Sequence, residues 1–187
     1  MVHRPTRNEL LAARDKGVRD VIAPNLDVLF IGINPGLYTA AVGHHFARPG
    51  NRFWAALHQA GFTERVLAPQ EERELLKVGC GITNMVNRAT ATASDLTHAE
   101  LVRGARRIAA KVRRYRPRAV ALLGVTTYRA AFARPRARLG RQREDLAGAA
   151  LWVLPNPSGL NAHFKPADFA RLFRRVRTAA RGSRSSR

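Results

Sequence analysis

The sequence predicts a single α/β domain built on a mostly parallel sheet. Three short apolar runs, 29–33, 119–124 and 151–155, are rich in β-branched, aromatic or aliphatic residues and stop at Asn, Gly or Pro. Such runs are typical of strands that are buried on both faces, as in a parallel sheet. Stretches with helical periodicity lie between them, and strands that alternate with helices favour this fold class.

Length and cysteine content exclude several classes of protein. A chain of 187 residues is long enough for one domain with a sizeable core. No apolar run approaches the length of a membrane span, and the first residues lack the apolar segment of a secretory signal. Cys80 is the only cysteine, which excludes internal disulfides, cysteine-based zinc clusters and four-cysteine iron–sulfur centres. We therefore expect a cytoplasmic protein with no membrane partner, in a bacterium one located at the nucleoid.

The charge indicates a polyanionic partner. The chain has 33 Lys and Arg residues against 13 Asp and Glu residues, a formal net charge of +20. Genomic base bias would explain why only four of the basic residues are Lys, but it does not explain the shortage of acids. An excess of this size favours binding to nucleic acid.

In the first 61 residues we expect a peripheral N-terminal segment, one core strand, a long loop and a helix. Residues 1–25 are expected to be peripheral, with a short helix within 8–21. After the strand at 29–33, the segment 37–51 is expected to be a long loop, and long ordered loops tend to be functional. A helix is expected over 51–61, where a glycine ends the apolar stripe.

The middle of the chain is expected to form a short helix, a strand and the longest helix. The helix spans 70–77 and the strand 82–86. Thr97 and Glu100 have the spacing of a capping box, which predicts that a helix begins there and continues to residue 115. The polar face of this helix carries six basic residues, for which a solvated surface is the simpler interpretation.

The remaining segments complete the domain. A helix is expected at 126–132, and an exposed basic loop at 134–143. Pro166 suits the first turn of a last helix, where its missing N–H is tolerated. Residues 181–187 are expected to form a disordered basic tail. With no repeat and no linker, residues 26–180 are interpreted as one domain.

Polar turns follow two of the predicted strands. One is Asn34-Pro35-Gly36 and the other is the segment 156–161. If the strands are parallel neighbours, both turns lie at the same edge of the sheet, where ligands bind in open α/β folds. Asn34 is then a polar side chain at the mouth of a site, although an ordinary turn residue is the simpler alternative. The adjacent His44 and His45 lack further ligands nearby, so no metal site is expected.

Three motifs resemble those of the mismatch-specific uracil/thymine DNA glycosylases of the uracil-DNA glycosylase superfamily. They are Gly-Ile-Asn-Pro-Gly-Leu at 32–37, Pro-Gly-Asn-Arg-Phe-Trp at 49–54 and Asn-Pro-Ser-Gly-Leu at 156–160. They occur in family order within residues 26–176. The resemblance implies a three-layer αβα sandwich with a short, mostly parallel central sheet. It also implies a monofunctional enzyme that needs no metal or organic cofactor.

The implied reaction removes a damaged base from double-stranded DNA. The enzyme flips the base out of the duplex and hydrolyses its N-glycosidic bond, leaving an abasic site. Uracil, chiefly opposite guanine, is the expected substrate, with thymine, ethenocytosine and deaminated purines as further candidates. We expect the enzyme to act as a monomer.

The resemblance assigns roles to residues near the first motif. Asn34 matches the residue that positions the attacking water; an amide orients water but is a poor base, so the reaction depends on oxocarbenium character and on hydrogen bonds to the departing base. Phe46 matches the residue that stacks on the flipped base, with core packing as the alternative. The Asn84 side chain and backbone N–H groups near Ile33 and Phe46 are candidates for binding the base edge.

Three further residues carry expectations of different kinds. His45 matches a pocket histidine, and Thr39 lies where pocket size would influence acceptance of the thymine methyl group. Asp95 is a candidate general base, because the Asn34 motif has no carboxylate. The simpler interpretation is that Asp95 or Thr97 caps the long helix.

The last motif is expected to form a wedge. Ser158, Gly159, Leu160 and Asn161 match the segment that fills the space left by the flipped base, with Leu160 inserted into the stack. The family often has Arg two residues after this Leu, but this chain has Ala162. That difference leaves recognition of the orphan guanine open.

Two other functions compete with the glycosylase. The first is a non-catalytic nucleic-acid-binding module on the same fold. The second is a phosphate-binding or nucleotide-binding protein, which the absence of a Gly-rich loop with Lys-Ser/Thr disfavours.

Overall fold

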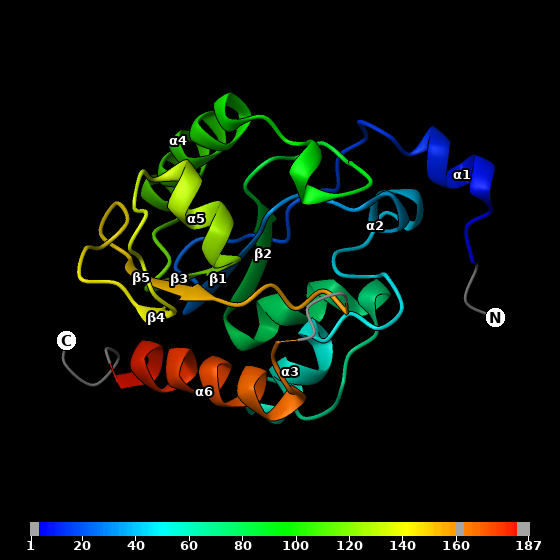
Figure 1. Ribbon diagram of the computed structural model, residues 1–187. Coiled ribbons are helices and arrows are strands. Elements are labelled where there is room, and N and C mark those ends of the chain that lie inside the picture. The colour runs from blue at the N-terminus through cyan, green and yellow to red at the C-terminus, as the bar shows by residue number, and fades with distance from the viewer. Residues whose placement is uncertain (1–3, 160–162, 183–187) are drawn as a thin grey trace.

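Five strands form one central sheet in the order β2-β1-β3-β5-β4 (Figure 1). The computed structural model describes residues 4–159 and 163–182. The strands are β1 (Val28–Gly32), β2 (Cys80–Asn84), β3 (Ala119–Leu123), β4 (Gly140–Arg141) and β5 (Ala150–Leu154). All pairings are parallel except that of β4 with β5. The prediction of a mostly parallel sheet is confirmed, and the carboxyl ends of β1, β2, β3 and β5 meet at one edge.

Helices cover both faces of the sheet and make three layers. The α-helices are α1 (Arg7–Ala12), α2 (Leu37–Val42), α3 (Phe53–Gln59), α4 (His98–Tyr115), α5 (Val125–Ala131) and α6 (Pro166–Gly182). Two 3₁₀ helices, η1 (Pro69–Val78) and η2 (Ala93–Asp95), flank β2 in the sequence. Helices α4 and α5 lie on one face, and α3 and α6 on the other (Figure 1). This is the expected αβα sandwich.

Alternate side chains of β1 enter two separate cores. Phe30 packs against Phe53 of α3 and Phe173 of α6, with ring centroids 5.3 and 5.4 Å apart. Its neighbours Leu29 and Ile31 belong to the core under α4 and α5. Successive side chains of a strand point to opposite faces, so a strand between two helical layers must be apolar at every position. This explains the unbroken apolar run that predicted β1.

The N-terminal helix is shorter than predicted. Thr6 and Glu9 cap its start, and it ends at Ala12, shortly before Asp15 adopts a positive φ of 64°. The chain then continues in extended form, and Val21 makes a β-bridge with Ile82. Val18 and Val21 are therefore both buried outside a helix, and Val21 lies against the sheet.

The segment 37–51 begins with a helix that the sequence analysis did not predict. Helix α2 has only six residues and ends at Gly43, whose φ of 78° suits glycine. It packs against α1, and Ala40 joins a small apolar cluster there with Ala13 and Ala89. An element this short has too few turns to show helical periodicity.

Two strands also differ from the prediction. Strand β2 begins and ends two residues earlier than expected, because Cys80 pairs with Val28 at the start of β1. Strand β4 lies within the segment predicted to be an exposed basic loop, where Gly140 pairs with Val153. A pairing of only two residues leaves no recognisable alternation in the sequence.

The caps and ends of the two long helices, α4 and α6, lie closer to their predicted positions. Thr97 caps α4 through the predicted capping box with Glu100. Helix α6 continues to Gly182, so it includes the first two residues of the predicted tail; residues 183–187 lie outside the described residues. Within the described part of the chain, the helices are too short or too polar to cross a membrane.

Candidate active site

A cavity of about 380 Å³ opens at the carboxyl ends of β1 and β2, beside the start of α2. It is lined by residues from all three sequence motifs. Seven of the predicted site residues line it: Ile33, Asn34, Thr39, His45, Phe46, Asn84 and Ser158. Asp95 and Gly159 are described but do not line it. The fold thus brings together polar and aromatic side chains from segments more than 100 residues apart.

The amide of Asn34 is held in one orientation. Its Nδ2 donates hydrogen bonds to the Arg88 carbonyl oxygen at 2.9 Å and to Thr90 Oγ1 at 2.7 Å. The Thr90 hydroxyl donates its own hydrogen to the Thr92 carbonyl at 2.6 Å, so it must accept from Asn34. Both amide hydrogens are therefore used, and Asn34 Oδ1 is the acceptor left for a ligand in the cavity.

The loop that carries Arg88 is fixed to helix α4. The Arg88 guanidinium contacts Glu100 at 2.7 Å and Asp15 at 2.9 Å. Arg88 also holds the pKa of the Glu100 carboxyl at about 2, well below its usual range. Because Glu100 belongs to the α4 cap, the backbone that anchors Asn34 is tied to the end of a long helix. The sequence analysis did not identify Arg88 or Thr90; both lie in a polar loop without a recognisable pattern.

Phe46 provides an aromatic wall. Its ring stacks on Phe53 with centroids 4.1 Å apart and an interplanar angle of 26°. The residue is half-buried, has a positive φ of 54° and lines the cavity. The two expectations for Phe46 are therefore compatible, since core packing on one face leaves the other available to a planar ligand.

His45 is a neutral pocket residue. It is 1% exposed, and burial lowers its pKa below the ordinary histidine value. Its Nε2 lies 2.9 Å from the Arg19 carbonyl oxygen, so this nitrogen carries the hydrogen and Nδ1 is an acceptor. Nδ1 is 3.5 Å from Asn84 Nδ2, which orients the Asn84 amide.

A buried carboxylate positions the two histidines. Glu72 of η1 accepts a hydrogen bond from the His45 backbone N–H at 2.8 Å and lies 3.1 Å from His44 Nδ1. This contact holds the segment that carries Phe46 against η1. The sequence analysis missed Glu72, because an acidic residue in a charged short helix resembles a surface residue.

Gly32 lets the side chains close over the end of β1. A Cβ at this position would lie 2.5 Å from Asn84 Oδ1 and 3.4 Å from Phe46 Cζ. The first distance is a clash, so any larger residue would displace the Asn84 amide. The glycine of the first motif is therefore required for close approach rather than for an unusual backbone conformation.

Asp95 lies outside the cavity as an exposed capping residue. Its carboxylate accepts hydrogen bonds from the Thr92 N–H at 3.0 Å and the Thr92 hydroxyl at 3.1 Å. These bonds lower the pKa of Asp95, which makes it a weaker base. It caps η2, whereas Thr97 caps the long helix. Among the described residues that line the cavity, none is Asp or Glu.

Arg52 supports the segment that was predicted to form the wedge. Its guanidinium donates to the carbonyl oxygens of Ser158 and Phe164, each at 2.6 Å, and lies 4.5 Å from the centre of the Phe169 ring. A planar guanidinium can hold two carbonyls at once. Arg52 belongs to the second motif, but its partners follow it by more than 100 residues, and no local pattern indicates them.

The beginning of the wedge segment is also closely packed. Ser158 N–H donates to Asn156 Oδ1 at 3.0 Å, which forms a turn at the end of β5. A Cβ on Gly159 would lie 2.8 Å from the Gly50 carbonyl oxygen, so the third motif passes directly over the second. The rest of the predicted wedge, Leu160 and Asn161, lies outside the described residues, as does Ala162 at the position of the family arginine.

The described residues offer no metal centre. Within 4–159 and 163–182, no three His, Cys, Asp or Glu side chains are grouped so that they could hold a metal ion. Cys80 lies in the core, and burial raises its pKa to about 12. A thiol with such a pKa is a poor nucleophile and a poor metal ligand at neutral pH.

Comparison with known proteins identifies a family with this architecture. A family model described as the uracil DNA glycosylase superfamily matches residues 19–177, most of the chain. Among solved structures, the chain is similar to an NMR structure of a candidate uracil DNA glycosylase from Methanosarcina acetivorans. The TM-score is 0.59 at 19% sequence identity, and the match covers 87% of this chain and 98% of the other. At this identity, the structural likeness concerns the fold.

Proposed function

Because the chain belongs to the uracil DNA glycosylase superfamily, we propose that it removes uracil from double-stranded DNA as a monofunctional, mismatch-specific glycosylase. The preferred substrate is uracil opposite guanine. The observation that carries this proposal is the fixed amide of Asn34, whose Oδ1 is the acceptor left in a cavity without a carboxylate. The three sequence motifs that line the cavity support the mismatch-specific branch.

The cavity suits a flipped pyrimidine. Phe46 offers one ring face for stacking, because Phe53 covers the other. Asn84 presents an amide hydrogen and Oδ1, which complement the N3–H and carbonyl groups of a uracil edge. Thr39, which is 7% exposed, lines the same cavity and limits the room beside C5 of the base, where thymine carries its methyl group.

Hydrolysis follows from these contacts without a strong base. Asn34 Oδ1 accepts a hydrogen bond from a water molecule and directs its oxygen at C1′ of the sugar. The C1′–N bond breaks, and its electron pair leaves with the base, whose anion is stabilised by Asn84 Nδ2 and backbone N–H groups near Ile33 and Phe46. The water oxygen bonds to C1′ and loses its proton to solvent. Neutral His45 orients Asn84 and donates no proton to the base, because its N–H is bound to the Arg19 carbonyl.

A single-turnover cleavage assay tests this function. Duplexes with G·U, A·U and G·T pairs and single-stranded uracil DNA are incubated with the wild type, with Asn34→Ala and with Asn8→Ala, a control on the exposed face of α1. We expect uracil release, fastest from G·U, to fall at least a hundredfold in Asn34→Ala with DNA affinity retained. Asn8→Ala should behave as the wild type.

Release from no substrate, despite DNA binding, would contradict the proposal. It would favour the alternative of a non-catalytic DNA-binding module on the same fold. Equal release from G·U and A·U would retain the glycosylase but remove the mismatch preference.

A further inference from the structure

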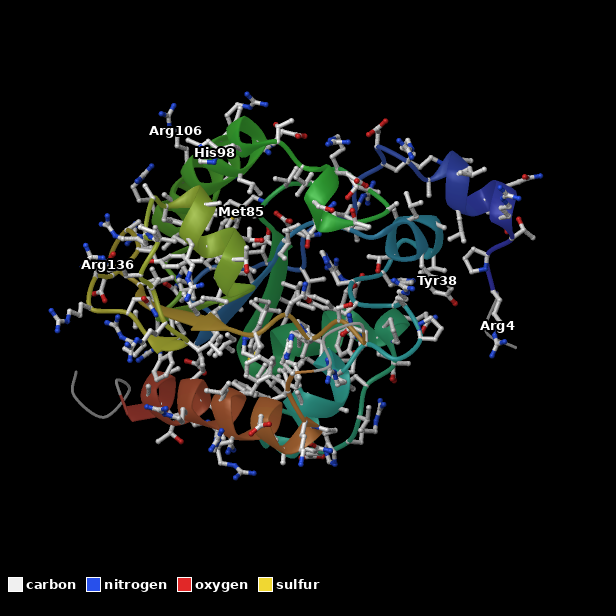
Figure 2. All side chains as sticks on the ribbon, in the orientation of Figure 1. Arg4, Tyr38, Met85, His98, Arg106 and Arg136 are labelled. Atoms are coloured by element: carbon white, nitrogen blue, oxygen red, sulfur yellow. The ribbon has the colours of Figure 1, made fainter. Side chains whose placement is uncertain are left out.

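A second charged surface lies away from the cavity. The segment 134–143, called the arginine loop below, connects α5 to the β4–β5 pair and carries five exposed arginines: Arg134, Arg136, Arg138, Arg141 and Arg143. Figure 2 shows Arg136 at the opposite end of the molecule from Tyr38, which neighbours the cavity residue Thr39 on α2. The proposed reaction uses none of these arginines.

The arginine loop is built by its own hydrogen bonds. Arg129 of α5 donates twice to the Ala137 carbonyl oxygen, at 3.0 and 2.7 Å. Gln142 Nε2 donates to the Arg138 carbonyl at 2.8 Å and to the Gly140 carbonyl at 3.0 Å. Pairing of β4 with β5 fixes the end of the loop. The arginines therefore project from an ordered scaffold, unlike those of a basic tail.

Acidic residues neutralise only part of this loop. Glu144 pairs with Arg134 at 2.6 Å, and Asp145 pairs with Arg141. In the part of the chain that the structure describes, no acidic side chain forms an ion pair with Arg136, Arg138 or Arg143. The loop surrounds a surface hollow of about 480 Å³. Exposed guanidinium groups on a fixed scaffold are complementary to phosphate oxygens.

The surface between the cavity and the arginine loop is mostly apolar. A hollow of about 410 Å³ shares Ile33 with the cavity and Leu139 with the arginine loop. Its lining includes the apolar Leu96, Leu101 and Val125 and the polar Ser94, Thr126, Thr127 and Asn156. None of the described residues that line this hollow is Lys or Arg, whereas the arginine loop carries five arginines. Along this hollow, the basic side chains of the described residues do not continue from the cavity to the loop, so the arginine loop is a separate basic surface.

We propose that the arginine loop is a second DNA-binding surface, which binds the phosphate backbone of a DNA segment other than the one at the cavity. The proposal rests on the proposed function for the choice of DNA as the partner. Its three unneutralised arginines bind without sequence preference, as phosphate contacts do. Holding two segments at once lets the protein pass from one to the other while it searches for a rare lesion.

A bridging experiment tests the second surface without any cleavage. Two uracil-free 15-base-pair duplexes, one with a donor dye and one with an acceptor, are mixed with the protein, and energy transfer and stoichiometry are measured against salt. We expect the wild type to bind two duplexes. In the variant Arg136→Gln/Arg138→Gln/Arg143→Gln, binding of the second duplex should weaken at least tenfold. The slope of log K against log salt concentration for the second duplex should become shallower by about 0.9 for each phosphate that the variant no longer binds.

A matched variant separates the loop from net charge. Arg103→Gln/Arg106→Gln/Arg107→Gln removes the same charge from exposed positions on α4 and should still bridge. Single-turnover uracil release by the loop variant should stay within twofold of the wild type. Bridging that survives in the loop variant, or that disappears equally in the α4 variant, would overturn the proposal. Loop-dependent bridging by a protein that releases no uracil would overturn the proposed function alone.

Discussion

At the scale of single residues, the candidate site depends on which atom of an amide faces the cavity. Asn34 has a donor and an acceptor of nearly the same shape, and only the acceptor can hold a water with its oxygen toward a sugar. Thr90 decides between them, because its hydroxyl hydrogen is already donated to the Thr92 carbonyl. Thr90 thus determines which atom of the Asn34 amide remains for a ligand in the cavity.

Replacing Thr90 tests this dependence. Thr90→Val removes the oxygen that accepts from Asn34 Nδ2 but keeps the shape of the side chain. An unpaired amide hydrogen costs about 1–3 kcal/mol, so we expect the single-turnover rate of uracil release to fall about tenfold to a hundredfold. Thr90→Ser keeps the hydroxyl and should retain most of the rate. Equal rates in the Val and Ser variants would show that the hydroxyl does not orient Asn34.

At the scale of elements, segments far apart in the sequence hold each other at the carboxyl edge of the sheet. Arg52, at the start of α3, spans the carbonyls of Ser158, the first residue of the predicted wedge, and Phe164, which follows the wedge. Its own N–H donates to the Pro157 carbonyl at 2.9 Å. The second motif thereby supports the described part of the third, through the carbonyl oxygens of Pro157 and Ser158.

Replacing Arg52 by lysine should slow uracil release from duplex substrates most. Arg52→Lys keeps the charge, but a single ammonium cannot span both carbonyls. If the segment 158–161 fills the space left by a flipped base, we expect the rate on G·U duplexes to fall about tenfold or more, and the rate on single-stranded uracil to fall much less. Single-turnover rates on both substrates measure this, with the melting temperature as a check of folding. Equal losses on both substrates would assign Arg52 to the fold alone.

At the scale of the whole molecule, positive charge covers several faces. Among the described residues, exposed basic side chains that contribute to the formal net charge of +20 lie on the outer faces of α4 and α6 and on the arginine loop, and Figure 2 shows Arg106 and Arg136 on one side of the molecule. The cavity itself contains one charged residue among its described lining, Arg48. We therefore propose that charge supplies attraction to DNA in general and that the cavity selects the base.

If surface charge supplies the attraction to DNA, salt should strongly weaken the affinity for DNA. Each phosphate contact should contribute about 0.9 to the slope of log K against log salt concentration. We expect the affinity for uracil-free duplex to fall steeply between low and physiological salt. The preference for a uracil-containing duplex over a matched one should change much less. Titrations by fluorescence anisotropy measure both, and an affinity independent of salt would contradict a role for the basic surface.

Much of the fold could be predicted from the sequence because it depends on local patterns. The apolar runs of β1, β3 and β5 and the capping box of α4 reflect burial and backbone geometry over a few neighbouring residues. Two polar turns after parallel strands also placed Asn34 and Ser158 at one edge of the sheet. The six-residue helix α2 and the two-residue strand β4 were missed, since each is too short for its period to show.

Only the tertiary structure decided how the site residues are connected. Thr90 and Asn34, or Arg52 and Phe164, are far apart in the sequence and meet because the sheet brings their loops to one edge. For Asp95, the sequence allowed a general base or a cap of the long helix, but its contact with Thr92 places it in the capping box of η2, while Thr97 caps the long helix. Local patterns record which residues are buried, whereas a hydrogen-bond partner depends on where the folded chain places the other atom.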